Sequence, residues 1–150
     1  MSVRVQEEDF DVGAEIAALR EGKTSIGGIC TFTGLVRDLN EGAGVGAMTL
    51  EHYPGMTEKM LREIEEEAHR RWNLDASLIV HRFGTLTAGD QIVLVITASA
   101  HRTEAFEACH FLMDWLKTKA PFWKSETLSD GSERWVEARD TDDQAVEKWS

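Results

Sequence analysis

The segment at residues 114–126, DWLKTKAPFWKSE, combines three lysines with aromatic side chains around a proline. These lysines are Lys117, Lys119 and Lys124. An ammonium group beside apolar surface loses hydration, which lowers its pKa and makes the amine usable as a base or nucleophile. Residues 99–102, Ser-Ala-His-Arg, add a histidine and an arginine that suit an anion. Together the two segments predict an active site that handles an anion.

The three lysines differ in what they indicate. Lys117 and Lys119 fall in the last turn of a predicted helix, where a cation is favoured for purely structural reasons. Lys124 follows Pro121 and has no such explanation. A chain reversal at Pro121 would bring Lys117 and Lys124 near one another, and two adjacent ammonium groups lower each other's pKa. The spacing therefore favours these two lysines as the reactive groups.

Two histidine-arginine pairs are candidate binding groups. Arg102 is predicted in the first turn of a helix, where backbone amides, the helix dipole and a guanidinium together suit a phosphate or carboxylate. The alternative is a surface ion pair with Glu104, which contributes little. His101 lacks another His or Cys at metal-ligand spacing, so no zinc site is expected. The second pair, His81-Arg82, ends a predicted strand and is either a binding pair or an exposed rim.

Hydrophobic periodicity and capping residues predict the elements that position these groups. Strands are predicted at 2–6, 25–36, 48–53, 76–83, 91–99, 122–128 and 134–138, with 76–83 and 91–99 forming a hairpin. Helices are predicted from Asp9 or Asp11 to Gly22, from Pro54 to about Asn73, and from a Ser99 cap to about Ala120. Residues 37–46 are predicted as a glycine-containing loop. This partly segregated order indicates a single α+β domain.

Composition narrows the class of protein. The 150 residues carry 27 acidic and 16 basic side chains, a net charge of −11, which disfavours nucleic acid as the main partner. No apolar run approaches the roughly 20 residues needed to cross a membrane, and no signal peptide is visible, so a cytoplasmic protein is expected. The acidic tail at about 138–150 is interpreted as a solvated segment. Cys30 and Cys109 are interpreted as buried structural thiols.

Six longer motifs carry a family resemblance. They are FTGLVRD at 32–38, LEHYPGMTEKM at 50–60, HRFG at 81–84, SAHRTEAFEA at 99–108, MDWLKTKAPFWKSE at 113–126 and RWVEAR at 134–139. In this order, over nearly the whole chain, they resemble the catalytic (large) subunit of molybdopterin synthase, the MoaE family. The resemblance implies an α/β hammerhead fold with additional antiparallel strands.

The same resemblance implies an activity and two kinds of partner. In this family, cyclic pyranopterin monophosphate is converted to the dithiolene molybdopterin. The sulfur arrives as a thiocarboxylate on the C-terminal Gly-Gly of a small ubiquitin-like subunit, and the large subunit forms the central homodimer of a heterotetramer. Because the partner delivers the sulfur, no catalytic cysteine is expected, and neither a metal nor a cofactor is expected for this step.

The resemblance also assigns residues to the substrate site: Arg37, His101, Arg102, Lys117, Lys124, Glu126 and Arg139. The first three are expected to hold the phosphate and the pterin, some of them across the dimer interface. Glu126 is expected to orient a lysine or bind the pterin, and Arg139 to help hold the partner's tail.

The two lysines receive catalytic roles. Lys117 is expected to transfer a proton or to meet the acyl group of the incoming tail. Lys124 is expected to stabilise negative charge as sulfur attacks and oxygen leaves. Two other classes of function stay open at this point. One is a non-catalytic module that binds a ubiquitin-like tail, and the other is a phosphate-ester enzyme that acts alone.

Overall fold

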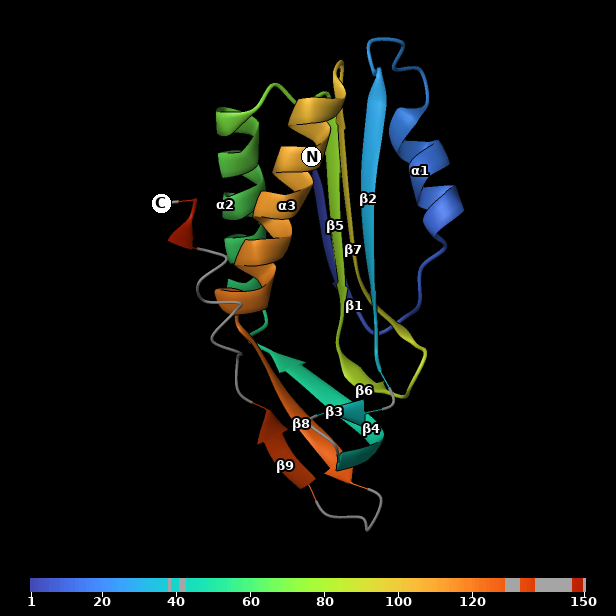
Figure 1. Cartoon of the computed structure of the whole chain (residues 1–150), viewed down its shortest axis with the longest axis vertical. Coiled ribbons are helices and arrows are strands. Elements are labelled where there is room, and N and C mark those ends of the chain that lie inside the picture. The colour runs from blue at the N-terminus through green and yellow to red at the C-terminus, as the bar shows by residue number, and fades with distance from the viewer. Residues whose placement is uncertain (38, 41–42, 129–132, 137–146, 150) are drawn as a thin grey trace.

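The computed structural model describes residues 1–37, 39–40, 43–128, 133–136 and 147–149 of the chain. The described residues form two β-sheets, a longer one covered by helices and a second one at its end (Figure 1). No helix in these residues is long and apolar enough to span a membrane.

The first sheet has the strand order β1-β5-β7-β2. Its strands are β1 (Ser2–Gln6), β5 (Ala76–Arg82), β7 (Gln91–Ser99) and β2 (Gly28–Leu35). β1 runs parallel to β5, whereas the β5–β7 and β7–β2 pairs are antiparallel. Successive side chains of a strand point to opposite faces, and β5 and β7 are buried on both faces by mostly apolar side chains. The predicted hairpin of residues 76–83 and 91–99 is confirmed.

Three helices cover the two faces of this sheet. α2 (Met56–Arg71) and α3 (Arg102–Thr118) pack on one face, and α1 (Val12–Arg20) packs on the other (Figure 1). Asp11 caps α1 by accepting a hydrogen bond from the backbone N–H of Ala14 at 3.0 Å. The predicted Ser99 cap of α3 is wrong. His101 is the capping residue, because the Ser99 hydroxyl instead donates to the carbonyl of Asn73 at 2.7 Å.

The second sheet joins segments that are distant in sequence. It contains β3 (Leu39–Asn40), β4 (Ala43–His52), β6 (Gly84–Leu86), β8 (Phe122–Leu128) and β9 (Glu133–Val136). The prediction of a loop at 37–46 is wrong in part, since β3 and the start of β4 pair within it. β6 was not predicted, because it has only three residues and is stabilised by pairing with β4.

These sheets and helices confirm the predicted α+β class, with an α/β hammerhead and additional antiparallel strands. The two sheets meet where β5, α3 and β8 come together, since α3 ends at Thr118 and β8 begins at Phe122. Pro121, which was predicted to end the helix, lies between them. The junction of the two sheets is therefore where the lysine-containing segment lies.

The turn that precedes α3 is held against β2, and this contact gives a first prediction. The N–H of Gly27 donates to the carbonyl of Ser99 at 2.9 Å, and a Cβ at residue 27 would lie 2.1 Å from the carbonyl oxygen of Ala100. We expect Gly27→Ala to lower the free energy of unfolding by about 1–3 kcal/mol, because the backbone must shift to relieve this overlap. Urea denaturation measures the loss.

Gly13→Ala is the matched control. A Cβ there meets its nearest atom, Asp11 Oδ1, at an ordinary 3.5 Å. Residue 13 lies in α1, so alanine is expected to raise stability by up to about 1 kcal/mol. Equal effects of the two substitutions would contradict the close approach of residues 27 and 100.

Candidate active site

Helix α3 carries predicted site residues at both of its ends. His101 and Arg102 stand at its N-terminus, and Lys117 lies in its last turn. At a rise of about 1.5 Å per residue, the helix holds Arg102 and Lys117 about 22 Å apart. In one chain these residues therefore form two separate groups of cations, which a single small substrate does not bridge.

The N-terminal end of α3 is exposed. His101 has an extended backbone and makes no capping hydrogen bond with its side chain, and both His101 and Arg102 are exposed. The alternative ion pair between Arg102 and Glu104 is not found among the described residues, and Glu104 Oε2 is buried there without a hydrogen-bond partner. An exposed arginine in the first turn of a helix is a feature that suits an anion.

The C-terminal end of α3 leads directly to the second lysine. Lys117 is exposed and Lys124 is half-buried. Between them the chain turns at Pro121, and the N–H of Phe122 donates to the carbonyl of Ala120 at 2.8 Å. Lys124 then pairs with Leu50 in the register of β8 and β4. The predicted chain reversal at Pro121 is wrong, because β8 continues away from the end of α3 instead of folding back along it (Figure 1).

His81 is buried near the two lysines, and their charges affect its pKa. It is 8% exposed at the end of β5, and its ring stacks on Phe122 with centroids 3.8 Å apart and planes 17° apart. Burial is the main cause that lowers the pKa of His81 to about 4, and the positive charges of Lys124 and Lys117 act in the same direction. The charges of both lysines thus reach His81, which is buried where the two sheets meet.

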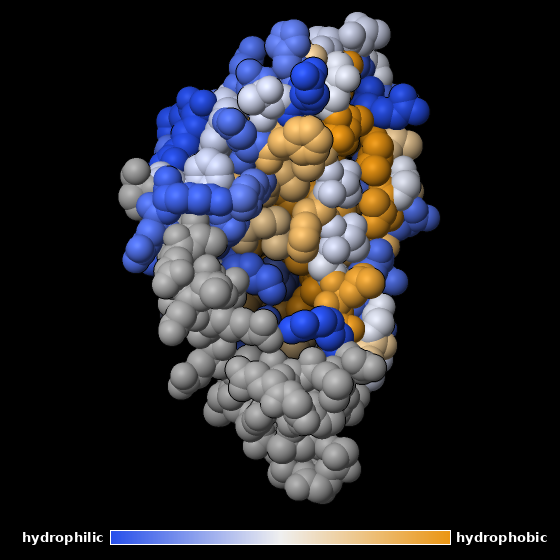
Figure 2. All heavy atoms as spheres, viewed as in Figure 1, coloured by the Kyte–Doolittle hydropathy of each residue, from blue (hydrophilic) through white to orange (hydrophobic). Residues whose placement is uncertain are grey.

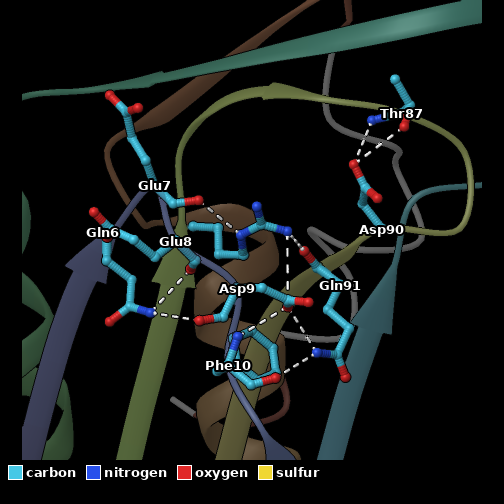
Figure 3. Close-up of polar contacts among 9 residues, drawn as sticks. Gln6, Glu7, Glu8, Asp9, Phe10, Thr87, Asp90 and Gln91 are labelled. Atoms are coloured by element: carbon cyan, nitrogen blue, oxygen red, sulfur yellow. Dashed lines mark hydrogen bonds and ion pairs between the residues drawn. The ribbon is translucent and has the colours of Figure 1, made fainter.

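Arg82, the neighbour of His81, has a structural role. Its Nε donates to the carbonyl of Glu7 at 3.0 Å, and its Nη1 donates to the carbonyl of Gln91 at 2.8 Å. The Gln91 side chain in turn donates to Asp9 Oδ1 at 2.8 Å, and this hydrogen bond is the main cause that lowers the pKa of Asp9 (Figure 3). Arg82 therefore fastens the segment between β1 and α1 to β7 and is occupied by these contacts.

Arg37 and Glu126 lie near the same part of β4. Arg37 is exposed and directly follows Val36, which packs in one cluster with Met48. The backbone of Glu126 pairs with Met48 in the register of β8 and β4. Both residues thus belong to the lysine end of the molecule rather than to the Arg102 end. Arg139 lies outside the described residues.

The face formed by α3 and β2 is unusually apolar. Figure 2 shows apolar side chains gathered over this part of the molecule. Phe106 of α3 is 62% exposed and Phe32 of β2 is 41% exposed. β2 is also an edge strand, since it pairs only with β7 among the described residues. An exposed aromatic surface beside a free strand edge is typical of a surface that another chain covers.

A family model described as MoaE protein matches residues 5–119. The chain belongs to this family. The matched region runs from β1 to the end of α3 and includes His101, Arg102 and Lys117, whereas Lys124 lies beyond it.

Relatives and solved structures extend the similarity past residue 119. A molybdopterin synthase catalytic subunit of Ralstonia nicotianae is 57% identical over 148 residues, which cover 99% of this chain and 84% of the relative. A molybdopterin biosynthesis MoaE protein from Burkholderia ambifaria has a TM-score of 0.84 at 55% identity, with 99% of this chain and 97% of that one covered. Molybdopterin synthase from Staphylococcus aureus has a TM-score of 0.82 at 28% identity, with 89% and 96% covered. The second sheet is therefore part of the family fold.

The buried state of His81 predicts a loss of stability in acid. In the unfolded chain a histidine titrates near 6.5, and in the folded chain His81 titrates at about 4. Between these values the unfolded state binds a proton that the folded state does not, so stability falls as the pH falls through this window. We expect this histidine to contribute a loss of about 3 kcal/mol by pH 4.

The measurement is the difference in unfolding free energy between the wild type and His81→Phe, taken at pH 7 and at pH 4. Phenylalanine keeps the ring but does not titrate, so the difference should move in favour of the variant as the pH falls. Parallel pH curves for the two proteins would mean that His81 is not held uncharged by its surroundings.

Proposed function

We propose that this chain is the catalytic subunit of a molybdopterin synthase and converts cyclic pyranopterin monophosphate to molybdopterin. The two dithiolene sulfurs come from the thiocarboxylated C-terminus of a small ubiquitin-like subunit. Membership of the MoaE family and close similarity to molybdopterin synthase catalytic subunits support this reaction. The observation at the site that supports the proposal is the placement of Lys117 in the last turn of α3 and of Lys124 in β8, on the two sides of the turn at Pro121.

The two lysines fit the needs of sulfur transfer. The attack of a thiocarboxylate sulfur on the pterin displaces oxygen, so negative charge develops and a proton must be supplied. Lys117 is exposed at a helix end, where it reaches a substrate or the acyl group of a tail, and we assign proton transfer to it. Lys124 is half-buried on a strand, where a fixed ammonium group stabilises developing charge.

We further propose that two copies of the chain build one site. The Arg102 end of α3 supplies the binding groups for the substrate phosphate, and the Lys117 end supplies the catalytic groups. In a dimer with twofold symmetry the same patch of each chain faces the other, so two α3 helices that run antiparallel place the Arg102 end of one copy beside the Lys117 end of its partner. The separation of about 22 Å within one chain is then no obstacle.

The apolar face of α3 and β2 supports this arrangement. Phe32 and Phe106 would be buried against the second copy, and the edge of β2 would be covered. We also propose a cytoplasmic location, which fits Cys30 and Cys109 as free thiols in a reducing compartment.

The roles of the lysines are tested by substitution. We expect Lys117→Ala and Lys124→Ala each to lower kcat by about a hundredfold or more, because each removes charge or a proton from the reacting centre. Lys119→Ala is the matched control, an exposed lysine that follows the same helix, and should change kcat less than about threefold. Dithiolene formation is measured with the purified substrate and the thiocarboxylated small subunit.

Normal turnover by Lys117→Ala would show that Lys117 is not a catalytic residue. If the wild-type chain binds the small subunit but neither binds nor converts the pyranopterin, the chain is a non-catalytic module for the ubiquitin-like tail. Turnover without any small subunit would instead indicate a phosphate-ester enzyme.

The composite site is tested by mixing two inactive variants. Arg102→Ala and Lys117→Ala are expected to be nearly inactive alone. In a randomly mixed population of dimers, about a quarter of the sites would receive Arg102 from one copy and Lys117 from the other, so activity should return to about a quarter of the wild type. Steady-state turnover after co-refolding of equal amounts measures the recovery.

The control for this experiment mixes Lys117→Ala with Lys124→Ala. Both lysines lie at the same end of one chain, so no mixed dimer holds an intact site and no activity should return. Recovery in the control, or none in the mixture with Arg102→Ala, would contradict a site shared by two copies.

A further inference from the structure

Four aromatic rings join the two sheets at the lysine end of α3. His81 stacks on Phe122 at 3.8 Å, His52 lies 6.0 Å from Phe122, and His52 lies 4.5 Å from Phe83, all between ring centroids. His81 is the last residue but one of β5, His52 ends β4 and Phe122 begins β8. We call these four residues the junction rings. They form a continuous contact between the sheet under α3 and the sheet that holds Lys124.

Phe122 links the junction rings to the catalytic lysines. It lies two residues before Lys124, and its backbone pairs with His52 in the register of β8 and β4. It also packs against the main core, next to Ala120 at the end of α3. The position of Phe122 therefore sets where β8 starts, and with it the position of Lys124 relative to Lys117.

The ring of His81 is fixed by its own backbone neighbour. Its Nδ1 lies 2.9 Å from the carbonyl oxygen of Arg82, which only accepts hydrogen bonds, so Nδ1 carries the proton. This bond orients the ring, and the near-parallel stack on Phe122 follows from that orientation. A leucine or alanine at residue 81 would offer neither the flat surface nor the fixed orientation.

The charged groups around His81 make an uncharged ring necessary. Lys124 on β8, Lys117 on α3 and His52 on β4 each lower its pKa through their charge, and Arg82 is its neighbour on β5. A protonated His81 would place a further positive charge beside the two lysines, and repulsion would drive the groups apart. The low pKa of His81, about 4, keeps the ring neutral through the physiological range.

We propose that His81 is a positioning residue for sulfur transfer, whose ring supports Phe122 and so holds Lys124 at its working distance from Lys117. This role rests on the proposed function of the two lysines. His81 itself is buried and needs no contact with the substrate.

The test compares two substitutions at one position. His81→Ala removes the ring, so Phe122 loses its support, and we expect kcat to fall by about ten- to a hundredfold, as misplacement of a catalytic group by about 1 Å does. The KM for the pyranopterin should change less than about threefold, because the proposed phosphate-binding groups lie elsewhere. His81→Phe keeps the stack and should restore kcat to within about threefold of the wild type. Rates are measured with the thiocarboxylated small subunit and divided by the amount of folded protein.

His69→Ala is the matched control. His69 lies on the same face of the sheet, but its Nε2 contacts the Ser77 hydroxyl at 2.8 Å, away from the lysines. It should lower stability and leave kcat unchanged, which separates a loss of stability from a loss of positioning. If His81→Ala fails to fold, His81→Leu fills the space without a flat ring and is expected to show the same fall in kcat.

A failure of the His81 role can be told apart from a failure of the proposed lysine roles. A wild-type kcat in His81→Ala or His81→Leu overturns the positioning role, as does an equal loss in His81→Phe. If Lys117→Ala and Lys124→Ala are as active as the wild type, the proposed function of the lysines fails, and the role of His81 fails with it. If the lysine variants are inactive while His81→Ala is fully active, only the inference about His81 is wrong.

Discussion

The length of helix α3 is the constraint on which the account of the site depends. The helix is buried against β7 and β2 through residues such as Ala105, Cys109 and Leu112, so it acts as a rigid spacer. Its 17 residues keep a surface that suits a phosphate at one end and the lysines at the other. In the proposed function, one chain thus contains both halves of a site but does not bring them together. An antiparallel pair of chains would bring the Arg102 end of one copy beside the Lys117 end of the other. The exposed face of α3 and β2 is the surface on which such a pair can form.

The second sheet fixes the position of Lys124 relative to the end of α3. Lys117 is carried by the helix and Lys124 by a strand of the other sheet, so the distance between them depends on how the two sheets are joined. The junction rings make that join, and they do so in a buried place where two ammonium groups lie close by. An imidazole that stays uncharged can pack there, whereas a permanently charged side chain would compete with the lysines. Packing and electrostatics therefore both favour a flat, uncharged ring at residue 81.

Much of this structure could be predicted from the sequence, and the failures have physical causes. Periodicity located β5, β7, α2 and α3, because long apolar patterns are local signals. The strands within residues 37–46 could not be located, since their pairing with each other and with β8 supplies the stability that a glycine-containing sequence lacks. The Ser99 cap failed because a distant carbonyl, that of Asn73, takes up the hydroxyl. At the site, the turn at Pro121 was visible in the sequence, whereas the stack of His81 on Phe122 appears only in the structure, where β5 and β8 meet.

The most direct measurement is a crystal structure of this chain with its small subunit and the pyranopterin bound. The proposed site predicts that the C-terminal carboxyl of the small subunit ends within about 3–4 Å of the Nζ atom of Lys117 or Lys124. It also predicts that the substrate phosphate in the same pocket contacts Arg102 of a second copy of the chain. A tail that ends beside Arg102 of one chain with both lysines facing solvent, or a phosphate and tail bound within a single copy, would contradict it.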